Sequence, residues 1–164
     1  MGSEVTCELA RRLRELPGFV KSARKVKSGL TLRRFLDAEV IFHEEDLCDK
    51  VARSLARLVS PGTVLAGLET GGALLAERVA AVRGARYLRI PKDVGVLTYD
   101  IRGRTATIMD DVYTTGGSLR YAAGLLEGAG AAVDSAVVLV VRTEAKERPD
   151  EAFPVYYLFS DREI

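Results

Sequence analysis

The chain is poor in the residues on which acid–base, metal and disulfide chemistry most often depend. Its 164 residues include one histidine, His43, no tryptophan, and two cysteines, Cys7 and Cys48. His43 comes just before an acidic helix start, where a capping or surface role is the ordinary one, so no histidine general base is evident. The cysteines do not have the spacing of a metal site, and they predict reduced thiols in a cytoplasmic protein.

An excess of one charge and long apolar runs are also missing. The 24 basic and 23 acidic residues leave a formal net charge of +1, which disfavours a dedicated nucleic-acid binder. No apolar run is long enough to cross a membrane, and charged residues near the N-terminus exclude a secretory signal. The length suits one domain whose core needs no disulfide.

The sequence does contain an alternation of short apolar strands and amphipathic helices. The hydrophobic periods predict helices at 4–16, 44–58, 73–82 and 118–127, and a strand or hairpin within 19–41. They also predict strands at 64–68, 86–90, 105–109, 136–141 and 155–159, with a strand fragment near Val96-Leu97. This order predicts an α/β fold with a central, mostly parallel sheet flanked by helices on both faces.

The N-terminal third does not follow the strand–helix alternation. We therefore expect one domain in which residues 1–42 form a small lobe over one end of the sheet and residues 43–164 form the α/β core. Ligands of open α/β sheets bind at the carboxyl ends of the strands. The loops at 69–72, 91–103 and 110–118 are consequently the candidate ligand loops.

The segment after the predicted strand 105–109 carries the strongest functional signal. Two carboxylates, Asp110 and Asp111, precede the run Thr114-Thr115-Gly116-Gly117-Ser118, which opens a helix. Glycines, hydroxyls and the N–H groups of a helix start together suit a phosphate. Carboxylates would repel that phosphate, but they suit sugar hydroxyls, either directly or through Mg²⁺. The segment therefore predicts a site for a ribose 5-phosphate.

The string Ile108–Ser118 resembles the signature with which type I phosphoribosyltransferases bind 5-phosphoribosyl-1-pyrophosphate (PRPP). The resemblance implies that family's fold, with an N-terminal hood, a nucleobase as second substrate, Mg²⁺ as cofactor and a homodimer. It assigns PRPP binding to Asp110, Asp111, Val112, Tyr113, Thr114, Thr115, Gly116, Gly117 and Ser118. Asp110 and Asp111 would orient the ribose and are candidate Mg²⁺ ligands, alongside PRPP itself.

A second loop, Gly67–Gly72, resembles the family's pyrophosphate loop. The resemblance implies that Glu69, Thr70, Gly71 and Gly72 hold the leaving pyrophosphate. The glycines are also typical of a nucleoside-triphosphate P-loop, but Ala73-Leu74 stands where that motif needs Lys and Ser or Thr, which excludes it.

Three further stretches are similar to orotate phosphoribosyltransferases. Lys27-Ser28-Gly29 and the following Phe35 match that family's N-terminal signature, which implies that Lys27 and Phe35 lie near the base. Arg89 and Lys92 resemble the start of its mobile catalytic loop, which implies that they stabilise the pyrophosphate. Arg142 follows the strand 136–141, where the family holds the base with an arginine. The similarity implies conversion of orotate to orotidine 5'-monophosphate in pyrimidine biosynthesis.

The chain also departs from the orotate pattern. Leu32-Arg33-Arg34 replaces the usual Ser-Pro-Tyr, Ile90 stands in place of a lysine, and Val94 stands in place of the loop histidine. Two alternatives therefore stay open. The first is a purine or uracil phosphoribosyltransferase of a salvage route. The second is a regulatory protein that senses PRPP without catalysis.

Overall fold

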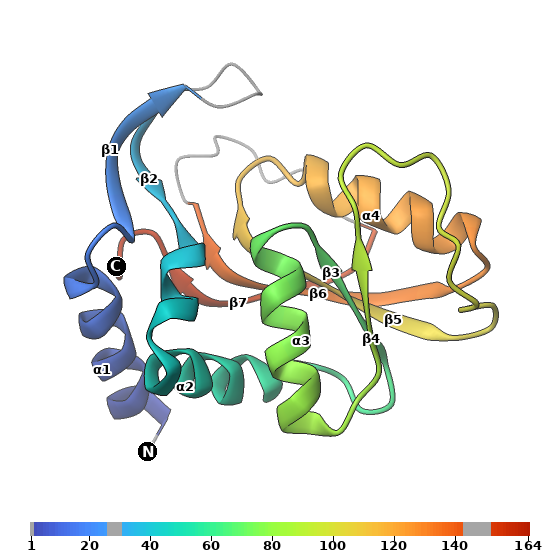
Figure 1. Cartoon of the computed structure of the whole chain (residues 1–164), viewed down its shortest axis with the longest axis horizontal. Coiled ribbons are helices and arrows are strands. Elements are labelled where there is room, and N and C mark those ends of the chain that lie inside the picture. The colour runs from blue at the N-terminus through green and yellow to red at the C-terminus, as the bar shows by residue number, and fades with distance from the viewer. Residues whose placement is uncertain (1, 26–30, 143–151) are drawn as a thin grey trace.

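Five parallel strands form the centre of the molecule. The computed structural model describes residues 2–25, 31–142 and 152–164. The strands are β3 (Val64–Leu68), β4 (Tyr87–Ile90), β5 (Thr105–Tyr113), β6 (Ala132–Val141) and β7 (Val155–Ser160), in the spatial order β4-β3-β5-β6-β7 (Figure 1). The predicted parallel sheet is confirmed.

Helices cover both faces of this sheet, as predicted. The helices α2 (Glu45–Ala56) and α3 (Gly71–Arg83) share one apolar cluster with Met109 and Leu139 of the sheet. The helix α4 (Gly117–Gly128) shares a second cluster with Ile108 and Val138, whose side chains point to the opposite face. Because both faces are covered, the interior of β6 is apolar at nearly every position.

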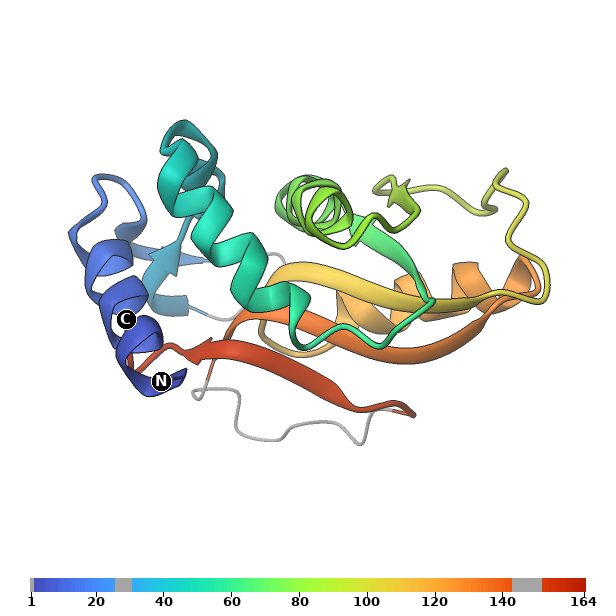
Figure 2. The same ribbon diagram turned by 90° about the horizontal axis from the view of Figure 1, so that it is seen from below.

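The N-terminal part forms the hood. It contains α1 (Gly2–Glu15), the antiparallel hairpin β1 (Val20–Lys25) and β2 (Thr31–Leu36), and the 3-10 helix η1 (Ala38–His43). Leu9, Leu13 and Phe19 are buried in the same cluster as α2, so the hood packs directly onto the core. Figures 1 and 2 place the hairpin beside the carboxyl ends of β5 and β6. The division at residue 42 stays a prediction.

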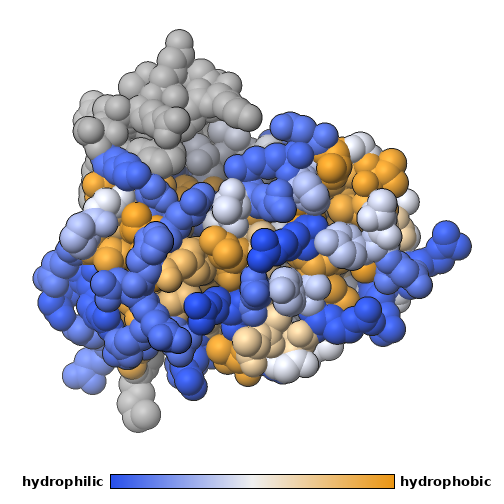
Figure 3. Space-filling model, viewed as in Figure 1, coloured by the Kyte–Doolittle hydropathy of each residue, from blue (hydrophilic) through white to orange (hydrophobic). Residues whose placement is uncertain are grey.

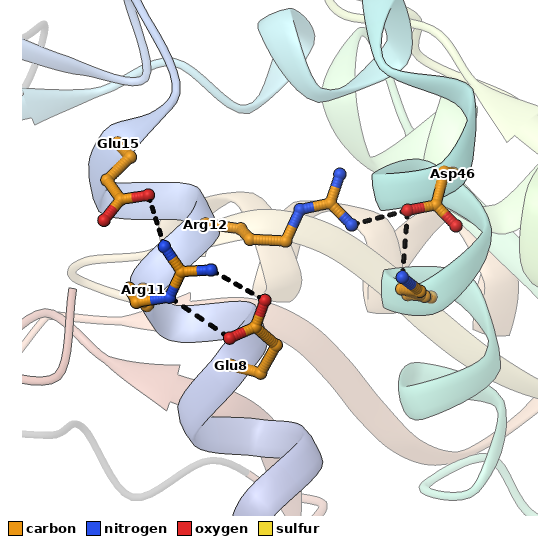
Figure 4. A network of polar contacts seen from close by, with 6 residues as sticks. Glu8, Arg11, Arg12, Glu15 and Asp46 are labelled. Carbon is orange, nitrogen blue, oxygen red and sulfur yellow. Dashed lines mark hydrogen bonds and ion pairs between the residues drawn. The ribbon is translucent and has the colours of Figure 1, made fainter.

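The surface between α1 and α2 is polar. Arg12 reaches from α1 to Asp46 of α2, and Asp46 also accepts from Lys50 (Figure 4). Arg11 pairs with Glu8 and Glu15 along α1 itself. Figure 3 shows the mainly hydrophilic surface of this region. Such exposed ion pairs contribute little to stability, so the buried side of α1 holds it in place. None of the described helices has the length and apolarity needed to span a membrane.

Two strand predictions beside the site were wrong, and the strand predicted at 136–141 begins earlier, at Ala132. Residues 91–104 contain no strand near Val96-Leu97, because Leu97 and Ile101 instead turn into the second apolar cluster as isolated anchors. The strand predicted to end at Met109 continues to Tyr113, so Asp110 and Asp111 belong to β5 and not to the loop. The extension follows from the partner strand, because Asp110 to Tyr113 pair with Val138 to Val141 of β6.

Candidate active site

The candidate site lies where the order of the strands reverses. From β3 the chain crosses first to β4 on one side and then to β5 on the other, so the loops after β3 and β5 meet at one edge. A cavity of about 500 Å³ opens there. Its lining comes from the hood and from all three predicted ligand loops: Leu36, Asp37, Glu39, Leu68, Glu69, Thr70, Gly71, Lys92, Asp93, Asp110, Asp111, Val112, Gly117, Ser118 and Tyr121.

The two aspartates at the end of β5 are held by the backbone that follows them. The amide of Asp111 donates to Oδ1 of Asp110 at 2.9 Å, and the amide of Val112 donates to Oδ1 of Asp111 at 2.8 Å. Both residues are half-buried and line the cavity. Each carboxylate is thereby held through one oxygen, which orients the pair toward a ligand.

The electrostatics of this pair are unusual. Burial raises the pKa of the Asp110 carboxyl well above its ordinary value of 3.8, and the nearby negative charge of Asp111 raises it further. An amide hydrogen bond from Asp111 and the positive charge of Lys92 act in the opposite direction and offset only part of the increase. A bound cation or a sugar hydroxyl would relieve the same repulsion, which is the behaviour expected of a ligand site.

The raised pKa predicts a pH-dependent stability. Because folded Asp110 holds its proton more tightly than unfolded Asp110, its contribution is fully present below about pH 4 and is lost as the pH rises through the folded-state pKa. We expect Asp110→Asn to be more stable to urea than the wild type, by an amount that grows from pH 4 to pH 8 in metal-free buffer. A difference that does not change with pH would contradict the raised pKa.

The run predicted to bind phosphate forms a small hollow after β5. It has a volume of about 70 Å³ and is lined by Thr114, Thr115, Gly116, Gly117 and Ser118 together with Asp110, Val112, Tyr113 and Leu119. Gly116 has a φ of 76°, in the left-handed region that favours glycine, and its carbonyl accepts from the amide of Arg120 at 3.0 Å. The turn therefore leads straight into α4, whose N-terminal end suits an anion.

The loop between β3 and α3 touches the aspartates directly. The peptide between Glu69 and Thr70 is cis, and the Glu69 amide donates to the carbonyl of Ile90 at 3.0 Å. A Cβ on Gly71 would overlap the carboxylate of Asp111, and one on Gly72 would overlap the carbonyl oxygen of Met109. Glycine at both positions is what lets this loop close against the end of β5.

The two basic residues predicted for catalysis lie in different surroundings. Lys92 is exposed and lines the cavity. Arg89 does not line it, because residues of β4 alternate between faces and Arg89 shares the exposed face with Tyr87. Its guanidinium instead pairs with Glu77 of α3 at 2.7 Å. A contact between Arg89 and a ligand in this cavity would require that pair to break.

The residues predicted to bind the base are only partly described. Lys27 lies outside the described residues, and for Phe35 the structure describes the backbone in β2 but not the side chain. Arg142 follows β6, where its amide donates to the carbonyl of Tyr113 at 2.9 Å, but only 3% of the residue is exposed and it does not line the cavity. These three assignments stay predictions.

Three residues that line the cavity were not among the sites predicted from the sequence: Asp37, Glu39 and Tyr121. Asp37 and Glu39 bring carboxylates to the hood side, where Asp37 accepts from the amide of Glu39 at 3.1 Å and pairs with Lys21. Tyr121 lies one turn after Ser118 on α4 and faces the same cavity. Its spacing of three residues from Ser118 was the available signal, since such residues share a helix face.

A glycine turn before a helix and a carboxylate pair, both at the switch point of a parallel sheet, define an α/β protein built to bind a phosphorylated ligand. A family model for the phosphoribosyl transferase domain matches residues 37–161, which is more than half of the chain. The chain therefore belongs to the phosphoribosyltransferase family, as the sequence resemblance predicted.

Individual relatives point to more than one base. An orotate phosphoribosyltransferase of a Nocardioides species is 36% identical over 132 residues, covering 76% of this chain and 74% of the relative. An adenine phosphoribosyltransferase of Mycobacteroides abscessus is 33% identical over 129 residues, covering 65% and 73%. The crystal structure of Mycobacterium tuberculosis orotate phosphoribosyltransferase in complex with inorganic phosphate matches with a TM-score of 0.79 at 19% identity, over 98% of both chains.

Proposed function

We propose that this protein transfers ribose 5-phosphate from PRPP to orotate and releases pyrophosphate. One observation carries the catalytic part of the proposal: the turn at 114–118 and the loop at 69–72 meet at one cavity with Asp110 and Asp111 between them. This arrangement suits a ligand with a phosphate at one end, a pyrophosphate at the other and a sugar diol in the middle. Orotate is proposed first because of the 36% identical relative and the Lys27-Ser28-Gly29 stretch.

The reaction requires little acid–base chemistry from the protein. A ring nitrogen of the base forms a bond to ribose C1 and loses its N–H proton to solvent, while the bond from C1 to the pyrophosphate oxygen breaks and its electron pair leaves with pyrophosphate. Asp110 and Asp111 would hold the ribose hydroxyls, and the amides of the two loops would hold the two anionic ends. Fixing both reactants and neutralising the departing charge are the main sources of rate acceleration in such a site.

Magnesium is the proposed cofactor, and the donor set fits it. Mg²⁺ in enzymes is commonly bound by one or two carboxylates together with substrate phosphates, and not by a complete protein cage. Asp110 and Asp111 supply such a pair, and no cluster of three or more metal-ligating side chains occurs in the described ranges. Bound there with PRPP, the ion would neutralise charge on the pyrophosphate.

Lys92 is the residue proposed to stabilise the leaving pyrophosphate from the protein side. It lines the cavity, and its positive charge acts on the carboxyl of Asp110. Family resemblance also supports a homodimer in the cytoplasm, which we propose for this chain; sedimentation analysis of the purified protein tests the dimer.

Adenine is the second candidate base, and the hood wall favours it. Asp37, which is already paired with Lys21, and Glu39 line the cavity, and Lys92 is the one basic residue in its described lining. Carboxylates accept from the N–H groups of an aminopurine, whereas they repel the carboxylate of orotate. Adenine phosphoribosyltransferases are also among the relatives above 30% identity.

A panel of bases tests the proposal. The protein is incubated with PRPP, Mg²⁺ and, separately, orotate, uracil, adenine, hypoxanthine, guanine or xanthine, and pyrophosphate release is measured. We expect release with orotate. Release with adenine alone would move the specificity to the second candidate. PRPP binding without release for any base would contradict catalysis and favour a PRPP-sensing regulator.

A further inference from the structure

A single hydroxyl joins the loop that carries Lys92 to the helix that follows the phosphate turn. The Tyr121 hydroxyl of α4 accepts from the amide of Val94 at 2.9 Å. The same oxygen lies 3.1 Å from the carbonyl of Pro91 and 2.9 Å from that of Val94. Its one proton can be donated to only one of the two carbonyls at a time, so the hydroxyl makes two hydrogen bonds to this turn at any moment.

The turn from Pro91 to Val94 has little else to hold it near the cavity. Asp93 has a φ of 65°, a left-handed conformation that non-glycine residues rarely adopt, which makes the turn tight. Lys92 and Asp93 are both exposed, and the next buried anchor along the loop is Leu97. Among the described residues, the side chain that hydrogen-bonds to the backbone of this turn is Tyr121.

Tyr121 lies between the turn proposed to bind the 5-phosphate and the turn that carries Lys92. Its ring packs half-buried against the apolar cluster beneath α4, and it lines the cavity together with Lys92, Asp93 and Ser118. Three residues earlier, Ser118 belongs to the turn proposed to bind the 5-phosphate. A rigid helix thus connects the phosphate turn to the point from which Lys92 extends.

We propose that Tyr121 is a positioning residue: its hydroxyl fixes the 91–94 turn against α4 and thereby holds Lys92 over the pyrophosphate side of the cavity. This inference rests on the proposed function for the role of Lys92, but the tethering of the turn does not depend on it. Without the hydroxyl, the ring keeps its packing while the turn loses its attachment.

A double-mutant cycle tests the link to Lys92. Tyr121→Phe is expected to lower kcat/KM for PRPP about 3- to 10-fold, the effect of a lost neutral hydrogen bond. Lys92→Ala should then lower kcat/KM for PRPP by a clearly smaller factor in the Tyr121→Phe background than in the wild type, because the amine of Lys92 is no longer held in place there. Independent, multiplicative losses would overturn the proposal, since a purely structural role would leave the effect of Lys92→Ala unchanged.

A second measurement needs no turnover. The chain has no tryptophan, so a Val96→Trp variant carries a single indole, at a position that is 77% exposed in the same loop. Adding Tyr121→Phe should lower the fluorescence anisotropy of that indole in the ligand-free protein. Tyr99→Phe is the matched control, because Tyr99 is an exposed tyrosine of the same loop without a hydrogen bond among the described residues. Its anisotropy should not change.

The two measurements separate the possible failures. Equal anisotropy in the Tyr121→Phe and control proteins would overturn the tether, whatever the enzyme does. A lowered anisotropy in a protein that releases no pyrophosphate with any base would instead overturn the proposed function and leave the tether standing.

Discussion

Replacing both Asp110 and Asp111 by asparagine is expected to remove nearly all PRPP turnover while the protein stays folded. The two carboxylates line the cavity between the proposed phosphate and pyrophosphate loops, and each has an oxygen held in place by a backbone amide. Hydrogen bonds to charged groups contribute about 1.5–3 kcal/mol each. Losing two predicts a fall in kcat/KM on the order of 10³-fold, measured as pyrophosphate release.

The fold should survive this change because asparagine has nearly the same shape and relieves the repulsion that raises the pKa of Asp110. Circular dichroism and thermal unfolding check this point. Asp93→Asn is the matched control: it removes a carboxylate from the same cavity, and asparagine tolerates the left-handed backbone found there. Its effect on kcat/KM should be small. Wild-type activity in the double variant would contradict the assignment of the ribose site.

The second large effect is expected at the glycine pair. In Gly72→Ala the new methyl group would overlap the carbonyl oxygen of Met109 and lie 2.8 Å from Cα of Asp110. Both are backbone atoms of β5 and cannot rotate away, so the loop after β3 must separate from the strand. Such overpacking costs about 1–3 kcal/mol of stability. We expect a lower unfolding temperature together with a loss of PRPP affinity in calorimetry.

Gly71→Ala should separate the loss of stability from the loss of PRPP affinity. The closest clashes there are with the carboxylate of Asp111, which can rotate once it gives up the hydrogen bond from the Val112 amide, so stability should fall less while PRPP binding is still lost. Gly124→Ala provides the control, because a Cβ at this position in α4 has no atom within 4 Å. Alanine inside a helix is up to about 1 kcal/mol more favourable than glycine, so this variant should be slightly more stable. Unaltered stability and affinity in Gly72→Ala would contradict the close contact.

Elements with a strong local pattern could be predicted from the sequence. The strand at 64–68 has the predicted bounds, and Gly71-Gly72 and Gly116-Gly117 lie at helix starts as expected, although α3 already begins at Gly71 and not at Ala73. The end of β5 could not be predicted, because aspartate disfavours strands and the pairing with β6 that overrides this preference is remote in sequence. The strand fragment predicted near Leu97 was wrong for the opposite reason. Leu97 and Ile101 are buried in the second apolar cluster, but no strand of the described ranges pairs with their backbone, so no strand forms there.

In the candidate site, too, some residues could be predicted from the sequence and others could not. The loop at 69–72 and the segment at 110–118 could be located because glycines, hydroxyls and carboxylates stand consecutively in the sequence. Glu39 lines the cavity from the hood and has no neighbouring residue that marks it, whereas Tyr121 could be found only through its spacing of three residues from Ser118. The direction of Arg89 depends on which face of β4 it occupies, and that face was not evident from a four-residue strand.

The contact between the glycine pair and β5 also has an evolutionary consequence. Any mutation that gives Gly71 or Gly72 a side chain displaces Asp111 or the end of β5, so the half of the cavity proposed for phosphoribosyl binding offers little room for inherited change. The opposite wall is built from the hood, where Asp37 and Glu39 line the cavity from the start of the short 3-10 helix η1. A lineage, or a directed-evolution library, can therefore explore new bases through the hood while the sugar-phosphate half stays fixed.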